Sequence, residues 1–238
     1  MTPRRPRIFP DAERVADAAA TDVAAALVAA VGARGRAGLM VCGGGTPVGL
    51  YHRLAALAGA PGHGAGPDWA LVHIYFADER AVPPDDEASN YRLVRETLAE
   101  PAGVPAANVH RMPADEPDLD AAAERYEAIL PATVDTVILG LGEDGHVASL
   151  FPGSSLLAER RRRVAAVIDA PKPPPRRLTV TPRVLDEARS VIVLATGSAK
   201  AGAVANAWTD EGVPSPARRL RDRDWYIDRL AAGSTFAS

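Results

Sequence analysis

Residues 139–153, "LGLGEDGHVASLFPG", place a histidine, two acids and four glycines at the end of an apolar run. That run, "VDTVILG" at residues 134–140, is rich in β-branched and aliphatic residues and ends in glycine, which is typical of a buried strand. His146 therefore stands where a buried strand opens to solvent, beside Glu143 and Asp144. Because histidine titrates near neutral pH, this position suits a group that transfers protons.

Similar segments on either side predict the fold class. Near-continuous apolar strands that alternate with helices indicate a parallel sheet covered on both faces. We therefore predict an α/β fold, a single Rossmann-like domain over residues 1–238 with a mainly parallel sheet and helices on both faces. The expected strands lie at residues 38–42, 69–76, 134–140, 163–169 and 190–197, and the expected helices at 11–31 (stopped by Gly32), from 47, at 88–100, at 118–130 and from 198. The glycine-rich residues 59–67 predict a flexible loop.

The composition excludes several classes of protein. The chain has 238 residues, a net charge of −3 and a single cysteine, Cys42. It therefore has neither a basic footprint for nucleic acid nor an internal disulfide framework. The N-terminus lacks the apolar core of a secretory signal, and "VAAALVAAVGA" from Val23 is too short to span a bilayer. We expect a cytoplasmic protein that binds neither membrane nor nucleic acid, as a monomer or a weak homo-oligomer.

Four of the predicted strands end in polar or glycine-rich segments. These are "CGGGTP" after residue 41, "ADER" after residue 76, "GEDGH" after residue 141 and "TGSAK" after residue 195. In open α/β sheets, ligands bind at the carboxyl ends of the strands. We therefore expect one pocket that receives all four segments.

The segment "GGGTP", which precedes a predicted helix, is suited to hold a phosphate. Glycines let backbone N–H groups approach an anion, Thr46 offers a hydroxyl group, and the helix N-terminus adds a favourable partial charge. A tight turn is the commoner reason for three glycines, so this motif needs nearby cations. Lys200 and Arg177 supply them, and Lys172 and Lys200 are the only lysines among 27 basic residues. An ammonium group at an anion site is not interchangeable with a guanidinium.

The segments "ADER" and "GEDGH" offer groups for catalysis. Arg80 is suited to orient a carboxylate or stabilise an oxyanion, whereas we expect Glu79 to lie in a solvated loop with a local ion pair. His146 is the candidate general base. Ser149 lacks the sequence pattern of a nucleophile, and His73 suits a structural role within its strand. No histidine pair has the spacing of metal ligands, so we expect no metal and no cofactor.

Taken together, these segments resemble the 6-phosphogluconolactonase family, within the superfamily that also holds the glucosamine-6-phosphate isomerases. The resemblance rests on five motifs in the family's order: "GGGTP..LY", "FADERAVPPDDEASNYR", "LGLGEDGHVASLFPG", "KPPPRRLTVT" and "ATGSAKA". It implies a Rossmann-like fold and hydrolysis of 6-phospho-D-glucono-1,5-lactone, a phosphosugar lactone of the oxidative pentose phosphate pathway. It also implies that neither a metal nor an organic cofactor takes part.

The resemblance implies a role for each residue that matches a motif. His146 would activate water, Arg80 would bind substrate and the developing oxyanion, and Asp144 would support them. The substrate-binding residues would be Gly44, Gly45, Thr46, Arg177 and Lys200 for the phosphate, with Asp78, Ser89 and Asn90 as further polar contacts.

The sequence departs from the family's pattern in two places. Cys42 and Gly45 stand where serines are expected, which removes a hydroxyl contact to the phosphate, and Val147 stands where threonine is usual. The roles of Lys172 and of the four arginines at 160–163 stay open. So does the question whether Arg80 or backbone amides stabilise the oxyanion.

Two other functions compete with lactone hydrolysis. In deaminases and isomerases of the same scaffold, as the resemblance has it, an acid follows the histidine five positions on, where this chain has Phe151. A phenyl ring cannot shuttle a proton, which favours the lactonase. A non-catalytic sugar-phosphate sensor would need a DNA-binding segment, and no helix-turn-helix pattern flanks the core.

Overall fold

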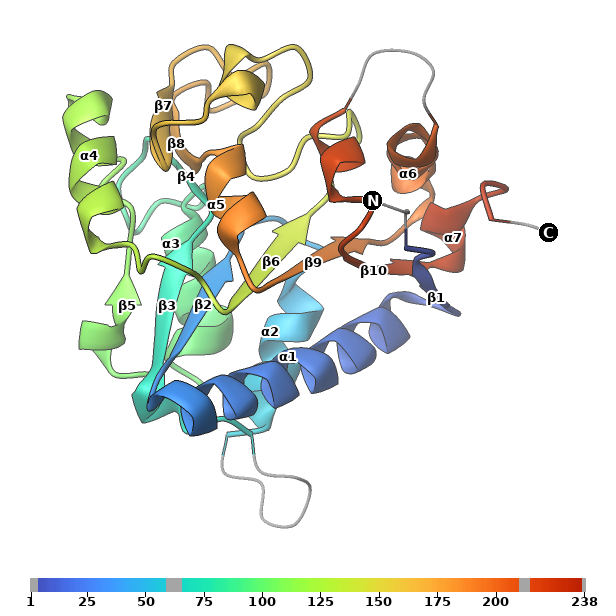
Figure 1. Ribbon diagram of the computed structural model, residues 1–238, viewed down its shortest axis with the longest axis horizontal. Coiled ribbons are helices and arrows are strands. Elements are labelled where there is room, and N and C mark those ends of the chain that lie inside the picture. Colours follow the sequence, from blue (N-terminus) through green and yellow to red (C-terminus); the bar gives the residue numbers. More distant parts are fainter. Residues whose placement is uncertain (1–3, 59–65, 210–214, 237–238) are drawn as a thin grey trace.

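The computed structural model describes residues 4–58, 66–209 and 215–236, which form two sheets surrounded by helices (Figure 1). Most of the glycine-rich loop predicted at residues 59–67 lies outside the described residues, as does His63. The larger sheet has seven strands, in the order β1-β10-β9-β6-β2-β3-β5, and the smaller sheet has three, in the order β4-β8-β7.

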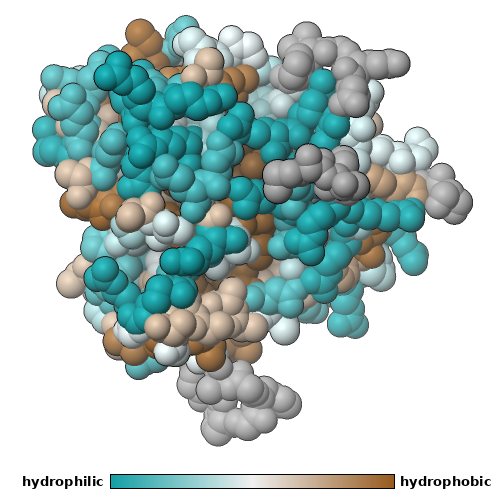
Figure 2. All heavy atoms as spheres, viewed as in Figure 1, coloured by the Kyte–Doolittle hydropathy of each residue, from teal (hydrophilic) through white to brown (hydrophobic). Residues whose placement is uncertain are grey.

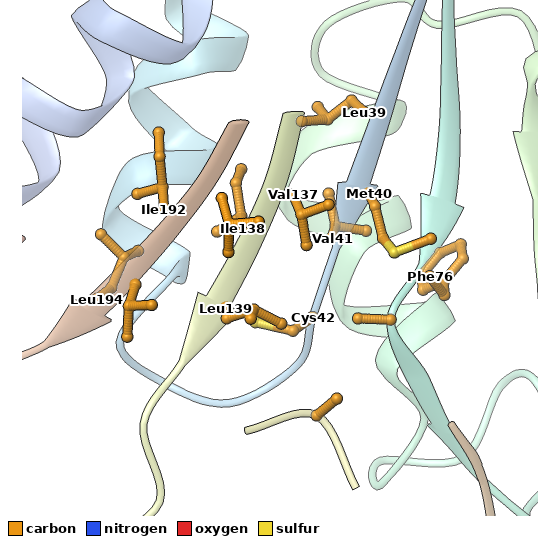
Figure 3. Close-up of a cluster of buried hydrophobic side chains, with 14 of the residues drawn as sticks. Leu39, Met40, Val41, Cys42, Phe76, Val137, Ile138, Leu139, Ile192 and Leu194 are labelled. Carbon is orange, nitrogen blue, oxygen red and sulfur yellow. The ribbon is translucent and has the colours of Figure 1, made fainter. Parts of the chain in front are cut away.

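All strand pairs in the larger sheet are parallel, so the prediction of a mainly parallel α/β fold is confirmed. In its central strands β2 and β6, every residue except Gly140 is buried, as their near-continuous apolar sequences predict. Figure 3 shows their side chains packed side by side, among them Val41, Leu139 and Ile192. The strands are β1 (Arg7–Phe9), β2 (Ala37–Val41), β3 (Val72–Phe76), β5 (Val109–His110), β6 (Thr136–Gly140), β9 (Ser190–Ala195) and β10 (Asp224–Asp228).

Helices lie on both sides of this sheet, with α1 and α2 below it in Figure 1 and α5 and α6 above it. The third predicted helix is shorter than expected, because a π-helical turn at Arg95–Ala99 follows α3. The helices are α1 (Ala12–Arg34), α2 (Val48–Ala56), α3 (Asn90–Val94), α4 (Leu119–Ile129), α5 (Pro182–Glu187), α6 (Ala201–Trp208) and α7 (Arg229–Ala232).

The first helix, α1, is longer than its apolar pattern predicted. Asp11 caps its N-terminus, and it continues through Gly32 to end at Gly35, which adopts the left-handed conformation (φ 73°) that a helix C-cap requires. By length and composition alone, its 23 residues could cross a membrane, whereas the shorter apolar run from Val23 could not. However, its buried residues, such as Val23 and Leu27, belong to the main core. The face of the molecule that Figure 2 shows is largely hydrophilic, with hydrophobic groups scattered across it.

The smaller sheet is antiparallel and was not predicted. It contains β4 (Asp78–Arg80), β7 (Val164–Val167) and β8 (Arg177–Val180). Strand β4 begins two residues after β3 ends, so this sheet lies beyond the carboxyl end of β3 (Figure 1). The predicted charged loop "DER" is therefore a strand, and its pairing with β8 places Arg80 directly opposite Arg177.

Candidate active site

One pocket, of about 170 Å³, receives residues from all four strand ends that the sequence singled out. It also receives residues from the segment before β8. This confirms that the four segments converge, because parallel strands all end at the same edge of a sheet. Its lining comprises Cys42, Gly43, Gly44, Gly45, Thr46, Pro47, Asp78, Arg80, Asn90, Gly140, Leu141, Gly142, His146, Ala148, Lys172, Arg177 and Lys200.

His146 and Asp144 form a hydrogen-bonded pair at the end of β6. The Nδ1 atom of His146 lies 2.5 Å from Oδ1 of Asp144. An ionised carboxylate can only accept, so Nδ1 carries the proton and Nε2 keeps its lone pair. Asp144 does not itself line the pocket, and acts on it through His146. This is the arrangement of a general base and of the acid that orients it.

Glycine is required in the turn that holds this pair. A Cβ atom on Gly142 would lie 2.0 Å from Nδ1 of His146 and 2.7 Å from Oδ1 of Asp144. Gly145 has a φ of +84°, and a Cβ atom there would lie 2.6 Å from Cβ of Ser215. The motif "GEDGH" therefore forms a turn that only glycines allow to close around the imidazole.

Burial lowers the pKa of His146 below its usual value, while the hydrogen bond and charge of Asp144 act in the opposite direction. The ring of Phe151 contributes to this burial, since its centroid lies 4.7 Å from that of the imidazole. Burial raises the pKa of Asp144, but the hydrogen bond and charge of His146, together with Lys172, outweigh it and lower the pKa. The pair is therefore a neutral imidazole beside a carboxylate at neutral pH.

Four cations line the pocket: Arg80, Lys172, Arg177 and Lys200. Asp78 is the carboxylate among the lining residues, so positive charge predominates. Arg80 and Arg177 are opposite each other on β4 and β8, and like charges in this position repel. Arg177 is 4% exposed, and its burial lowers its pKa, with the charge of Arg80 acting in the same direction. An anion in the pocket would relieve both effects.

A buried network links Asp78 to Arg177 through a serine. The hydroxyl group of Ser149 donates to Oδ2 of Asp78 at 2.7 Å, and Nη1 of Arg177 donates to Ser149 at 3.3 Å. Arg177 also donates to the backbone carbonyls of Lys172 and Pro174. Ser149 therefore connects two charged residues of the pocket lining, Asp78 and Arg177.

The glycine loop between β2 and α2 forms another wall of the pocket. Gly44 has a φ of +92°, which glycine adopts without strain, and the loop leads into α2 through Pro47. Asn90 packs closely against Gly43, since a Cβ atom on Gly43 would lie 1.8 Å from Oδ1 of Asn90. Asn90 in turn donates to the carbonyl and carboxylate oxygens of Asp78. The structure therefore joins the glycine loop to β4 through one amide side chain.

Cys42 follows β2 directly and is a buried thiol. Its Sγ accepts a hydrogen bond from the backbone N–H of Gly140 at 3.2 Å. Burial raises its pKa to about 12, so it stays a neutral thiol at physiological pH. The backbone of Cys42 is bonded to the hydroxyl group of Tyr51 on α2, which fixes the start of the glycine loop.

The expectation that Glu79 is solvated is wrong. Glu79 is 3% exposed, and its carboxylate accepts hydrogen bonds from the backbone N–H groups of Arg80, Asn90 and Tyr91 and from the hydroxyl group of Ser89. These donors include the first N–H groups of α3, which a helix cannot satisfy by itself. Ser89, a predicted substrate contact, does not line the pocket, and its Oγ accepts from Arg92 as the cap of α3.

Asp228 is a residue of the site region that the sequence reasoning missed. It lies at the end of β10, is 3% exposed, and accepts hydrogen bonds from the N–H groups of Gly197 and Ala231. Gly197 begins the turn that leads to Lys200. The available signal was an aspartate between a strand and a helix, which is typical of an N-cap.

Arg160, Arg161 and Arg162 form a surface turn organised by Glu159, whereas Arg163 is largely buried and its N–H group donates to Glu127. The carboxylate of Glu159 accepts from the backbone N–H groups of Arg160, Arg161 and Arg162 and pairs with Nε of Arg162. None of these arginines lines the pocket. Within residues 4–58, 66–209 and 215–236, no three His, Cys, Asp or Glu side chains are grouped to hold a metal ion.

The fold and the pocket define an α/β protein with a basic, histidine-containing site beyond the carboxyl ends of its parallel strands. Residues 10–228 match the family described as glucosamine-6-phosphate isomerases/6-phosphogluconolactonase, and the chain belongs to this family. The family predicted from the sequence is thereby confirmed.

Relatives with curated names agree with this membership. The chain is 39% identical to 6-phosphogluconolactonase of Mycobacterium tuberculosis, over 94% of this chain and 96% of that protein. It is 38% identical to 6-phosphogluconolactonase of Rattus norvegicus, over 84% of this chain and 81% of that protein.

Solved structures show the same fold. The structure of 6-phosphogluconolactonase from Shewanella baltica aligns with a TM-score of 0.81 at 28% identity, and covers 93% of this chain and 96% of that one. A monomeric glucosamine-6-phosphate deaminase aligns equally well, with a TM-score of 0.81, but at 22% identity, so it supports the fold alone.

Proposed function

We propose that this protein is an enzyme, a 6-phosphogluconolactonase, which hydrolyses 6-phospho-D-glucono-1,5-lactone to 6-phospho-D-gluconate in the pentose phosphate pathway. The observation that carries the proposal is the pocket itself, which combines an oriented neutral imidazole with four cations. Such a site suits an anionic substrate that must be attacked by water. The names of the relatives support the same activity.

In the proposed reaction, His146 is the general base. Its Nε2 takes a proton from water as the water oxygen bonds to the lactone carbonyl carbon. The bond from that carbon to the ring oxygen then breaks, and the proton passes to the ring oxygen, which leaves as a hydroxyl group. Asp144 holds the imidazole in the required tautomer and stabilises its transient positive charge, at a distance of 2.5 Å.

Arg80 is the proposed donor to the carbonyl oxygen as negative charge develops there. Its Nη1 is held by the carbonyl of Ala88, so the guanidinium is already oriented at the pocket lining. A donor that is already positioned needs little reorganisation when the oxyanion forms. The proximity of Arg177 keeps the local potential positive.

The phosphate would bind between the glycine loop and the turn at the end of β9. Gly44, Gly45 and Thr46 offer backbone N–H groups at the start of α2, and Lys200 lines the same pocket. Arg177 is the second proposed phosphate contact. Asp78 and Asn90, which also line the pocket, are the proposed contacts to substrate hydroxyl groups. Ser89 does not line the pocket, so we propose that it acts only through the start of α3.

These groups are sufficient for the proposed reaction. A positioned general base contributes about 100- to 10,000-fold to a rate. A donor to the oxyanion contributes about 100- to 1,000-fold. Because a lactone is already electrophilic, the two effects together require neither a covalent intermediate nor a cofactor.

The position of Phe151 argues against the deaminase alternative. Its ring contacts the imidazole of His146, and the guanidinium of Arg177 lies 5.5 Å from its centroid. An acid at this position would be needed to open a sugar ring, and Phe151 has no proton to give. The same ring instead excludes water from one side of His146.

The remaining expectations accompany this proposal. The partner would be a small phosphosugar lactone, and the protein would act in the cytoplasm as a monomer or a weak homo-oligomer. Binding of nucleic acid is not expected, since the net charge is −3.

A coupled assay tests the proposed function. Glucose-6-phosphate dehydrogenase generates the lactone in place, and acid release is compared with the spontaneous rate. We expect catalysis well above the spontaneous rate, and much weaker hydrolysis of unphosphorylated glucono-1,5-lactone. Equal hydrolysis of both lactones would contradict the phosphate site, and no acceleration of either would contradict the function.

A further inference from the structure

We infer that Asp228 is a positioning residue that holds Lys200 at the pocket and so determines selectivity for a phosphorylated substrate. The inference rests on the proposed function, which gives Lys200 its role. It concerns a residue that lies outside the pocket lining, on the strand next to the one that leads to Lys200.

The first step is the connection between Asp228 and the turn that leads to Lys200. Strands β9 and β10 are paired up to Ala195 and Ile227, so Asp228 lies beside the point where β9 ends. Both carboxylate oxygens of Asp228 accept from the backbone N–H of Gly197, at 3.1 and 3.0 Å. Lys200 follows three residues later, as the last residue of a single 3₁₀ turn at Ser198–Lys200. The position of Gly197 therefore sets the position of Lys200.

The second step is the unusual backbone of Gly197. Its φ of 88° and ψ of 153° fall in a region that is essentially restricted to glycine. Such a conformation persists only when the surroundings impose it. A carboxylate bound to its N–H group is the contact that imposes it here, because Asp228 is itself held as the N-cap of α7 by a 2.7 Å hydrogen bond from Ala231.

The third step is packing behind the same turn. A Cβ atom on Gly233, just after α7, would lie 3.3 Å from Cβ of Ala201, the residue that follows Lys200. The residue that follows α7 therefore packs closely against the start of α6. Asp228 holds the start of the turn through Gly197, and the segment after α7 packs against Ala201, so the backbone is held on both sides of Lys200.

The fourth step is charge. Within the described residues, no carboxylate oxygen lies within 4.0 Å of Nζ of Lys200, and this includes the carboxylate of Asp228. Asp228 therefore acts through backbone N–H groups and leaves the ammonium charge of Lys200 free for an anion. A carboxylate in an ion pair with Lys200 would instead have competed with a phosphate.

The test measures KM and kcat of variants for two substrates, 6-phosphogluconolactone and unphosphorylated glucono-1,5-lactone. For Asp228→Ala we expect KM for the phosphorylated lactone to rise about 5- to 20-fold, the loss expected when a charge-assisted hydrogen bond is weakened. We expect kcat, and all parameters for the unphosphorylated lactone, to stay within about twofold. In a Lys200→Ala background, Asp228→Ala should add nothing to KM, because both changes remove the same contact.

Two further variants separate positioning from folding. Asp228→Asn keeps Oδ1, which accepts from both Gly197 and Ala231, so it should recover part of the affinity. Gly197→Ala strains the turn without a clash, since a Cβ atom there would have nothing within 4 Å, and it should raise the same KM.

Asp118→Ala is the matched control. Asp118 caps α4 in the same way, with hydrogen bonds from the N–H groups of Asp120 and Ala121, but it does not line the pocket. Its loss should lower the melting temperature and leave KM unchanged. The inference would be overturned if Asp228→Ala changed both substrates equally, or if its effect on KM persisted undiminished without Lys200. Wild-type protein that hydrolysed neither lactone would instead contradict the proposed function.

Discussion

Replacement of Asp144 by Asn tests the central pair of the site. The change keeps the size of the side chain and removes the negative charge that fixes the tautomer of His146. Hydrogen bonds to charged groups contribute about 1.5–3 kcal/mol. Because the side chain of Asp144 is 33% exposed, solvent screens part of this contribution, and we take the lower end, about 1.5–2 kcal/mol. Since about 1.4 kcal/mol corresponds to a tenfold change in rate, kcat should fall about 10- to 30-fold.

The same variant should shift the pH profile in a defined direction. His146 acts as a base in its neutral form, and Asp144 raises its pKa against the lowering effect of burial. Without the carboxylate, the pKa of His146 falls further, so the acidic limb of the kcat/KM profile should move to lower pH. The plateau should be lower, because a weaker base takes a proton less readily.

The assay is the coupled measurement of acid release between pH 5 and 8, with the spontaneous rate subtracted. Glu143→Gln is the matched control, since it removes the same charge from an exposed neighbour of Asp144. It should leave kcat and the acidic limb unchanged. An Asp144→Asn enzyme with turnover within twofold of wild type and an unmoved acidic limb would refute the reasoning.

Three further outcomes follow from the geometry. His146→Ala should keep the fold and lose at least about 100-fold in kcat, and near-normal turnover would remove His146 as the base. Gly142→Ala should lower kcat about tenfold or more and leave the far-ultraviolet circular dichroism spectrum unchanged, since a Cβ atom on Gly142 would lie 2.0 Å from Nδ1 of His146. Gly202→Ala is the control, and it should leave kcat unchanged because a Cβ atom on Gly202 would have no atom within 4 Å. Glu79→Gln should reduce the free energy of unfolding in urea by about 1–3 kcal/mol, because an amide nitrogen would face N–H donors, and unchanged stability would contradict the role of that carboxylate.

The elements that the sequence predicted best are those whose signal is local. Strands β2, β6 and β9 are short apolar runs that end in glycine-rich or polar segments, and each was expected within a few residues of its observed bounds. Their parallel pairing followed from the intervening helices. Because parallel strands end at a common edge, the convergence of "GGGTP", "GEDGH" and "TGSAK" could also be predicted.

The elements that were missed depend on distant partners. Strands β4 and β8 are short and contain charged residues, and β4 forms because it pairs with β8, about 100 residues away along the chain. The burial of Glu79 has the same origin, since its four donors come from its own neighbour and from the start of α3. A charged residue in a short charged segment gives no local sign that it will be enclosed.

By itself, the sequence determined the type of sheet, the edge at which the site lies and the imidazole that stands there. These depend on hydrophobic periodicity and on the conformations that only glycine adopts, both of which are properties of neighbouring residues. Only the tertiary structure decided that Arg80 and Arg177 would lie opposite each other, and that Asp228 would hold the turn before Lys200. Those relations join segments far apart in the chain, and they arise because buried N–H groups and charges must find partners wherever the fold brings them.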